Sequence, residues 1–160
     1  MKHLLYAIVL LPTLLSLGAC QTKQALDTKM EEIAGDYRLQ SISDSRRSYL
    51  PEMTAAEQEA VSAARITRAG KDGTWVFEYT YPIPHPTQGG FQYHRMVQEL
   101  TWDQSFGCYF FTRLTEEDLR STGFAPEDIT VEMRGHGTVV IRNNQTHITC
   151  EWVHLNRAAL

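Results

Sequence analysis

Apolar and polar residues alternate most regularly between residues 74 and 81. Apolar side chains at every second position are typical of a β-strand with one buried face. A register shift of one residue would bury Glu78 and Thr80 instead, and burying the carboxylate would cost several kcal/mol. We therefore predict a strand whose inward face carries four aromatic rings: Trp75, Phe77, Tyr79 and Tyr81.

The same two-residue period predicts seven more strands, over residues 36–42, 65–69, 91–102, 108–114, 129–134, 138–142 and 147–154. Segments rich in glycine or asparagine separate most of them, which is typical of hairpins. A Thr-x-x-Glu capping box over residues 54–57 predicts a helix in one connection, and residues 115–123 predict a short acidic helix in another. Leu26, Met30 and Ile33 form an amphipathic helical stripe at the N-terminal end of the domain.

Prolines follow directly after this aromatic strand, at positions 82, 84 and 86. Because proline has no N–H to donate to a sheet ladder, we expect the strand to end at Tyr81. The loop over residues 82–90 would then stand at one mouth of a barrel.

Strands joined mostly by hairpins, with little helix, indicate a mainly β fold. An antiparallel barrel of roughly eight strands removes the edges that an open sheet would expose. We expect such a barrel, with an N-terminal helix and short helices in its connections. An α+β sheet layer and a filled sandwich remain alternatives.

The first twenty residues have a different pattern. Lys2 and His3 precede an apolar run over residues 4–17, and Gly18, Ala19 and Cys20 follow. A basic start, an apolar segment and a small-residue processing site make a secretory signal. The run, about 14 residues, is shorter than the roughly 20 that a membrane-spanning helix needs.

The tetrad Leu-Gly-Ala-Cys at residues 17–20 resembles the lipobox of bacterial lipoproteins. That resemblance implies a signal peptide over residues 1–19 and a lipidated Cys20 with a short tether over residues 20–25. Residues 26–160 contain no repeat and no second apolar span, so we expect a single β-rich domain there. Gln21, where an Asp would signal retention in the inner membrane, favours the outer membrane by the same resemblance. The expected place is the bacterial cell envelope, facing the periplasm, with the membrane as a partner through the lipid anchor.

Two further resemblances concern the barrel. Residues 33–39, Ile-Ala-Gly-Asp-Tyr-Arg-Leu, resemble the Gly-x-Trp signature of lipocalins, with Tyr37 in place of the Trp. Residues 74–79 and 93–100 are similar to the T-type phycobilin chromophore lyases, lipocalin-like barrels in which an aromatic-Glu strand precedes a Tyr-x-Arg strand. Both resemblances imply a lipocalin-like barrel, and neither extends to bilin chemistry.

Two cysteines remain once Cys20 is lipidated, an even count in an oxidising compartment. Cys108 shares a face of its predicted strand with Phe110, and Cys150 shares one with Trp152. We therefore expect a Cys108–Cys150 disulfide facing the core. The alternative is a pair of buried free thiols.

Charge and motifs exclude several classes of function. The net charge is −4 and no basic cluster exceeds Arg46-Arg47, which argues against nucleic-acid binding. The histidines show none of the usual metal-ligand spacings, so we expect neither a metal nor another cofactor. No nucleophile motif is present, and the carboxylates of Glu78 and Glu99 could lie on neighbouring strands without forming a catalytic pair. No catalytic residue is predicted.

The aromatic strand is the predicted site. If the barrel interior is incompletely filled, an apolar pocket would be lined by Trp75, Phe77, Tyr79, Tyr81, Tyr93, Arg95 and Phe110. The function expected first is a non-enzymatic outer-membrane lipoprotein that binds a small amphiphilic or hydrophobic ligand. The alternatives are a module that contacts another envelope protein and, third, an envelope hydrolase or lyase-like enzyme. A packed interior with an exposed apolar patch would favour a protein partner.

Overall fold

The structure is a computed structural model that describes residues 26–69, 73–85, 90–112, 114, 116–125, 127–135 and 137–156. Residues 33–160 form one compact unit, and the first 32 residues form another, in which residues 26–31 are helical. The predicted signal peptide, Cys20 and the tether lie outside the described residues. Within the described ranges, no helix has both the length and the apolar character to cross a membrane.

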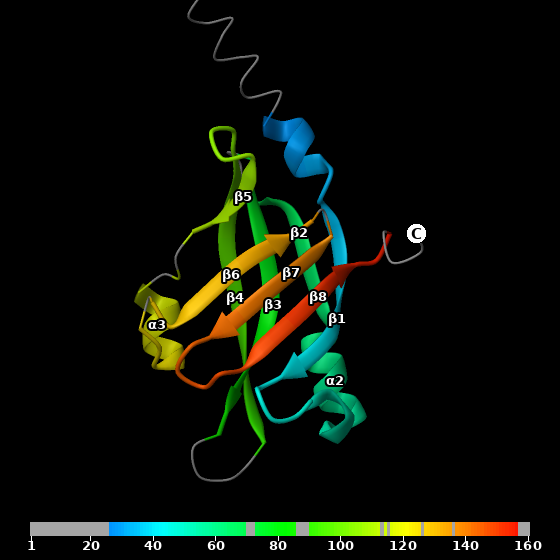
Figure 1. Cartoon of the computed structure of the whole chain (residues 1–160), viewed down its shortest axis with the longest axis vertical. Helices are drawn as coiled ribbons and strands as arrows, with labels where there is room; N and C mark the ends of the chain where they lie inside the picture. The colour runs from blue at the N-terminus through cyan, green and yellow to red at the C-terminus, as the bar shows by residue number, and fades with distance from the viewer. Residues whose placement is uncertain are drawn as a thin grey trace, which may run out of the picture. The chain divides into compact units, whose positions relative to one another are not determined.

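Eight antiparallel strands form a nearly closed barrel (Figure 1). They are β1 (Gly35–Ser43), β2 (Ala63–Ala69), β3 (Thr74–Pro84), β4 (Phe91–Asp103), β5 (Cys108–Phe111), β6 (Ile129–Arg134), β7 (Thr138–Asn143) and β8 (Thr149–His154). In the strand order β5-β4-β3-β2-β1-β8-β7-β6, consecutive strands pair with each other except β5 and β6, which lie at the two ends of the order and leave a seam. β1 pairs with β8. The predicted mainly β, eight-stranded antiparallel barrel is confirmed, with the up-and-down order of a lipocalin-like fold.

Short helices lie in the connections between strands: η1 (Leu50–Glu52) and α2 (Ala55–Ser62) between β1 and β2, and α3 (Glu116–Thr122) between β5 and β6. The predicted capping box is present at α2, because the Thr54 side chain accepts from the Glu57 backbone N–H while the Glu57 carboxylate accepts from the Thr54 N–H. α3 ends before Gly123, whose φ of +73° favours glycine.

The inward face of β3 carries the predicted aromatic residues, and all four are buried. Phe77 and Tyr79 stack with ring centroids 4.8 Å apart. The ring centroid of Trp152, from β8 on the other side of the barrel, lies 6.2 Å from that of Phe77 and 5.6 Å from that of Tyr79. The rings therefore pack against one another across the barrel interior.

Polar groups on these inner side chains find partners inside the barrel. The Tyr79 hydroxyl donates to Gln98 Oε1 at 2.8 Å, and Gln98 Nε2 donates to the Thr112 carbonyl at 2.9 Å. The Tyr81 hydroxyl donates to the Ile148 carbonyl at 3.3 Å. Hydrogen bonds of this kind offset the cost of burying these polar groups.

The glycine of the lipocalin-like segment, Gly35, sits where a side chain would not fit. Its φ is +135°, and a Cβ there would lie 2.9 Å from His154 Nε2. That imidazole nitrogen lies 3.0 Å from the Ala34 carbonyl oxygen. Tyr37 is buried beside the same imidazole, with ring centroids 5.0 Å apart, and its hydroxyl donates to the Ile33 carbonyl at 2.7 Å. Gly35 and Tyr37 thus belong to one close-packed cluster at the start of β1.

The prediction that the aromatic strand ends at Tyr81 is wrong, because β3 continues through Pro82 to Pro84. β2 pairs with β3 only as far as Glu78, so the end of β3 has a partner strand on one side alone. The His85 N–H bonds the Gly90 carbonyl across the hairpin. By the alternation of an antiparallel pair, the nitrogens of the two prolines therefore point to the side without a neighbour, where a missing N–H costs nothing.

Candidate functional site

The residues predicted to line a pocket do not come together. The four aromatic residues of β3 face inward, but Tyr93 and Arg95 lie on the outer face of β4, because Met96 and Gln98 are the inward residues opposite Tyr79 and Phe77. Arg95 forms an ion pair with Glu78 at 3.3 Å, with 73% of its side chain exposed. The prediction that Tyr93 and Arg95 share the inward face is wrong. Gln98 can take an inward position because both ends of its amide are hydrogen-bonded.

Phe110 and the two cysteines also depart from the prediction. Phe110 is 59% exposed, and Cys108 is exposed near it on the outer face of β5. Cys150 is buried in β8, opposite Ile42 of β1. Both thiols are free, so the predicted disulfide is wrong: the two cysteines lie on strands that are not neighbours, and only Cys150 faces the interior. Burial raises the pKa of the Cys150 thiol.

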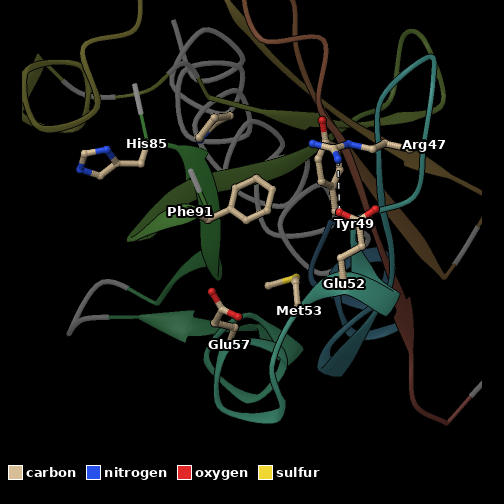
Figure 2. Close-up of a pocket in the computed structure, with 9 residues that line it drawn as sticks. Arg47, Tyr49, Glu52, Met53, Glu57, His85 and Phe91 are labelled. Carbon is tan, nitrogen blue, oxygen red and sulfur yellow. Dashed lines mark hydrogen bonds and ion pairs between the residues drawn. The ribbon is translucent and has the colours of Figure 1, made fainter. Parts of the chain in front are cut away.

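A cavity of about 340 Å³ lies instead where the β3–β4 hairpin extends past the other strands (Figures 1 and 2). We call it the rim cavity. One wall is the segment over residues 47–57, which leads from β1 into α2; the other is formed by the two ends of the hairpin connection. Its lining residues are Arg47, Tyr49, Glu52, Met53, Glu57, Pro84, His85, Gly90 and Phe91. Residues 86–89 of that connection lie outside the described residues.

The turn after β1 holds the first wall in place. The Asp44 carboxylate accepts from the backbone N–H groups of Arg46 and Arg47 and from the Tyr49 hydroxyl. The Tyr49 N–H in turn donates to the Ile42 carbonyl at 2.7 Å, which ties this segment to the barrel. The Tyr49 hydroxyl first, and the two backbone N–H groups after it, lower the pKa of Asp44 to about 2. Asp44 is therefore a fixed negative charge at the hydroxyl end of the Tyr49 side chain.

Aromatic rings and charges meet on the surface of the rim cavity. The Arg47 guanidinium lies over the Tyr49 ring, 4.5 Å from its centroid, and 3.3 Å from a Glu52 carboxylate oxygen. The Phe91 ring meets the Tyr49 ring edge to face, with centroids 5.2 Å apart. Figure 2 shows the Arg47–Glu52 pair on one side of the cavity and Glu57 on another, with Met53 between them in this view. The rim cavity thus combines apolar walls with placed charges.

Glu57 contributes the second carboxylate. The capping box holds it through the Thr54 N–H at 2.8 Å and the Thr54 hydroxyl at 2.7 Å, and these hydrogen bonds lower its pKa. Tyr93 lies beside it, where burial and the charge of Glu57 raise the pKa of the phenol to about 12. Glu57 is therefore ionised and held at the N-terminal end of α2.

Sequence reasoning missed the rim cavity. It placed the loop over residues 82–90 at a barrel mouth without linking it to the segment after the first strand, and it treated Arg46-Arg47 only as the largest basic cluster. Tyr49 belongs to none of the predicted strands, and Phe91 was placed at a strand end, so neither carried a pattern that pointed to a site. The one usable signal was the capping box, which correctly placed Glu57 in the first turn of a helix.

A separate surface feature lies on the β4–β5 hairpin. Val97 on the outer face of β4 is 41% exposed, Phe106 in the turn is 82% exposed, and Phe110 follows on β5. Large apolar side chains exposed in this way are candidates for contact with another molecule.

No protein family, curated protein or solved structure matches this chain. Across the residues that the structure describes, no group of three His, Cys, Asp or Glu side chains is placed to hold a metal ion.

Proposed function

We propose that this protein is a non-enzymatic lipoprotein of the bacterial envelope that binds a small ligand in the rim cavity. The lipobox-like tetrad at residues 17–20 supports attachment through Cys20, and Gln21 supports the outer membrane. The barrel serves as a rigid scaffold, since its inner aromatic residues are packed together.

The rim cavity is the observation that carries the binding proposal. Its volume of about 340 Å³ lies within the roughly 300–1,000 Å³ range of ligand sites. Tyr49, Met53 and Phe91 provide apolar surface, while Arg47 and the two glutamates provide a few fixed charges. Apolar walls with a small number of placed polar groups are typical of sites for small amphiphilic molecules.

A second candidate function is contact with another envelope protein through the β4–β5 hairpin. The exposure of Val97, Phe106 and Phe110 favours it. Aromatic residues are enriched at protein–protein interfaces, where they act as anchors.

Two phenylalanine variants separate these candidates. Native mass spectrometry of the protein extracted from its own membrane should reveal a bound small molecule that is lost in Phe91→Ser and kept in Phe110→Ser. The second candidate predicts the reverse dependence, with a bound protein lost only in Phe110→Ser. A small molecule retained equally by both variants would exclude the rim cavity as its site.

Membrane attachment is tested separately. Metabolic labelling with a fatty acid should mark the wild type and not Cys20→Ser, because the thiol is the acylated group. A Cys20→Ser protein that still takes label and still fractionates with membranes would refute the lipoprotein part of the proposal.

A further inference from the structure

We propose that the ligand of the rim cavity is a small organic cation, an ammonium group carried on an apolar body. This inference rests on the proposed function, because it concerns the same cavity. It adds the chemical class of the ligand, which cannot be inferred from the volume and apolar walls of the cavity alone.

The first support is the position of Arg47. Its guanidinium rests on the face of the Tyr49 ring while Glu52 lies 3.3 Å from it. An aromatic face combined with a carboxylate is the arrangement that attracts cations, through the ring quadrupole and the negative charge together. Arg47 therefore marks the place where a cationic group is stabilised in this cavity.

The second support is the charge balance. Among the lining side chains, Glu52 and Glu57 are carboxylates and Arg47 and His85 are the basic groups. The guanidinium of Arg47 is already paired with Glu52. Asp44, which does not line the cavity, adds a negative charge at the hydroxyl of the lining residue Tyr49. An anionic ligand would meet this excess of carboxylates, whereas a cationic ligand would be attracted by it.

The third support is the arrangement of the apolar surface. Phe91 meets Tyr49 edge to face at 5.2 Å, and Met53 lies between the two glutamates in Figure 2. A bare metal ion or a fully hydrated amine would not use these surfaces. A cation with an apolar body would cover them while its charged end lies near Glu57 or replaces the guanidinium on Tyr49.

Arg47 would then act as a built-in competitor. The side chains of Arg47 and Glu52 are 58% and 56% exposed, and pairs this exposed hold their partners weakly. Removing Arg47 should therefore strengthen binding of an organic cation, whereas it would weaken binding of an anion. This opposite sign distinguishes the two ligand classes.

The test uses the mature lipidated protein in a non-ionic detergent, with ¹³C-methyl-labelled methionine. The probes share one ring and differ in charge: benzyltrimethylammonium, benzyl alcohol and benzoate. The Met53 methyl signal should shift saturably with the cation and little with the other two, while Met96 in the barrel interior stays unchanged. Added salt should weaken binding of the cation.

Three variants complete the test. Glu57→Gln keeps a side chain that the capping box accepts, and it should weaken cation binding about three- to tenfold, as expected for one partly exposed charge. Arg47→Gln should tighten it about threefold by removing a competing charge of the same kind. Glu99→Gln, on an exposed site of β4 away from the cavity, should leave binding unchanged.

Each other outcome overturns the inference. Equal binding of the alcohol and the cation, or preference for benzoate, would refute the cationic class and leave small-ligand binding in the cavity standing. If binding does not tighten in Arg47→Gln, the competitor role is refuted, and with it the placement of the charged end on the Tyr49 ring. If no probe shifts Met53, the cation inference fails, and the dependence on Phe91 in native mass spectrometry decides the proposed function independently.

Discussion

The barrel interior and the rim cavity both contain aromatic rings, yet the pKa values of their ionisable groups favour the neutral form in the interior and the charged form at the rim. In the interior, burial raises the pKa values of Tyr79, Tyr81 and Cys150, so these groups remain neutral. At the rim, hydrogen bonds lower the pKa values of Glu57, which lines the cavity, and of Asp44, which contacts the lining residue Tyr49, so both carboxylates are charged at neutral pH. Desolvation dominates in one region and hydrogen bonding to a solvated charge in the other.

This difference separates packing from binding. Interior rings satisfy their polar groups within the barrel, as the Tyr79–Gln98 hydrogen bond does. The Tyr49 ring instead presents its face to a cation that is more than half exposed. A row of buried aromatic residues thus indicates a core, while aromatic residues beside exposed, fixed charges indicate a site.

The largest expected difference between interior and surface is in thiol reactivity. Cys150 is buried and its pKa is raised, so alkylation should require opening of the barrel; Cys108 is exposed. With a stability of about 5 kcal/mol or more, opening would slow the reaction of Cys150 roughly a thousandfold or more. Timed alkylation without reductant, read by peptide mass spectrometry, should label Cys108 alone. If neither thiol reacts and the protein's mass is lower than that of the reduced chain by two hydrogens, the two cysteines form a disulfide after all.

Removing a ring should destabilise the interior far more than the rim. Trp152→Ala should cost about 3–5 kcal/mol, because a buried indole packed on Phe77 and Tyr79 leaves a cavity. Phe91→Ala, at a partly exposed position, should cost about 1 kcal/mol. Urea unfolding of both variants measures the difference, and equal losses would contradict the contrast between the two regions.

Most of the fold could be predicted from the sequence, because period-two alternation and hairpin turns report burial directly. The sequence does not show which face of β4 points inward, because both faces carry large apolar residues: Tyr93 and Val97 on one, Met96 and Leu100 on the other. Hydrophobicity would place Gln98 on the outer face. It faces inward because its amide bonds the Tyr79 hydroxyl and the Thr112 carbonyl, which the sequence pattern does not reveal. Cys108 and Phe110 do share a face of β5, as predicted, but that face is the outer one, and taking it as inward produced the disulfide prediction.

The rim cavity depends on contacts that alternation does not record. Arg47, Tyr49 and Glu52 lie within six residues of one another, but Phe91 meets them only because the β3–β4 hairpin extends past the barrel. That extension depends on prolines tolerated at a one-sided strand, where the sequence pattern predicted a loop. Local patterns therefore predict the strands and helices. The rim cavity forms only because the β3–β4 hairpin is long enough to bring Phe91 to Tyr49.

A tyrosine-to-phenylalanine change tests polar satisfaction in the interior. Tyr79→Phe should cost about 1–3 kcal/mol, because Gln98 Oε1 loses its donor where no water replaces it. Changing Gln98 to Met in the same protein should recover part of that loss, since the unsatisfied amide is then removed as well. Thermal unfolding of the single and double variants measures the coupling. A loss below about 0.5 kcal/mol in Tyr79→Phe would mean that the hydroxyl is solvated.

A tyrosine-to-phenylalanine change at the rim should shift the pKa of Asp44 and leave the fold intact. Tyr49→Phe removes the strongest hydrogen bond to Asp44, so its pKa should rise from about 2 toward the ordinary value of 3.8. A carboxylate whose pKa is lowered on folding adds stability above the unfolded pKa and loses it as pH falls through the folded pKa. In the wild type this contribution should fade between about pH 4 and pH 2. In the variant the part due to the Tyr49 hydroxyl should be absent at every pH, while the part due to the two backbone N–H groups remains.

NMR titration of the Asp44 side-chain carbonyl measures this shift directly. Asp36 offers a matched control in the same protein, because its pKa is lowered by hydrogen bonding to Arg65 and does not involve Tyr49. Only Asp44 should move in Tyr49→Phe. If Asp44 of the wild type titrates near 3.8, the Tyr49 ring is not held by that carboxylate. Asp44 would stay ionised at neutral pH in that case, but the hydrogen bond that positions the Tyr49 side chain at the rim would be missing.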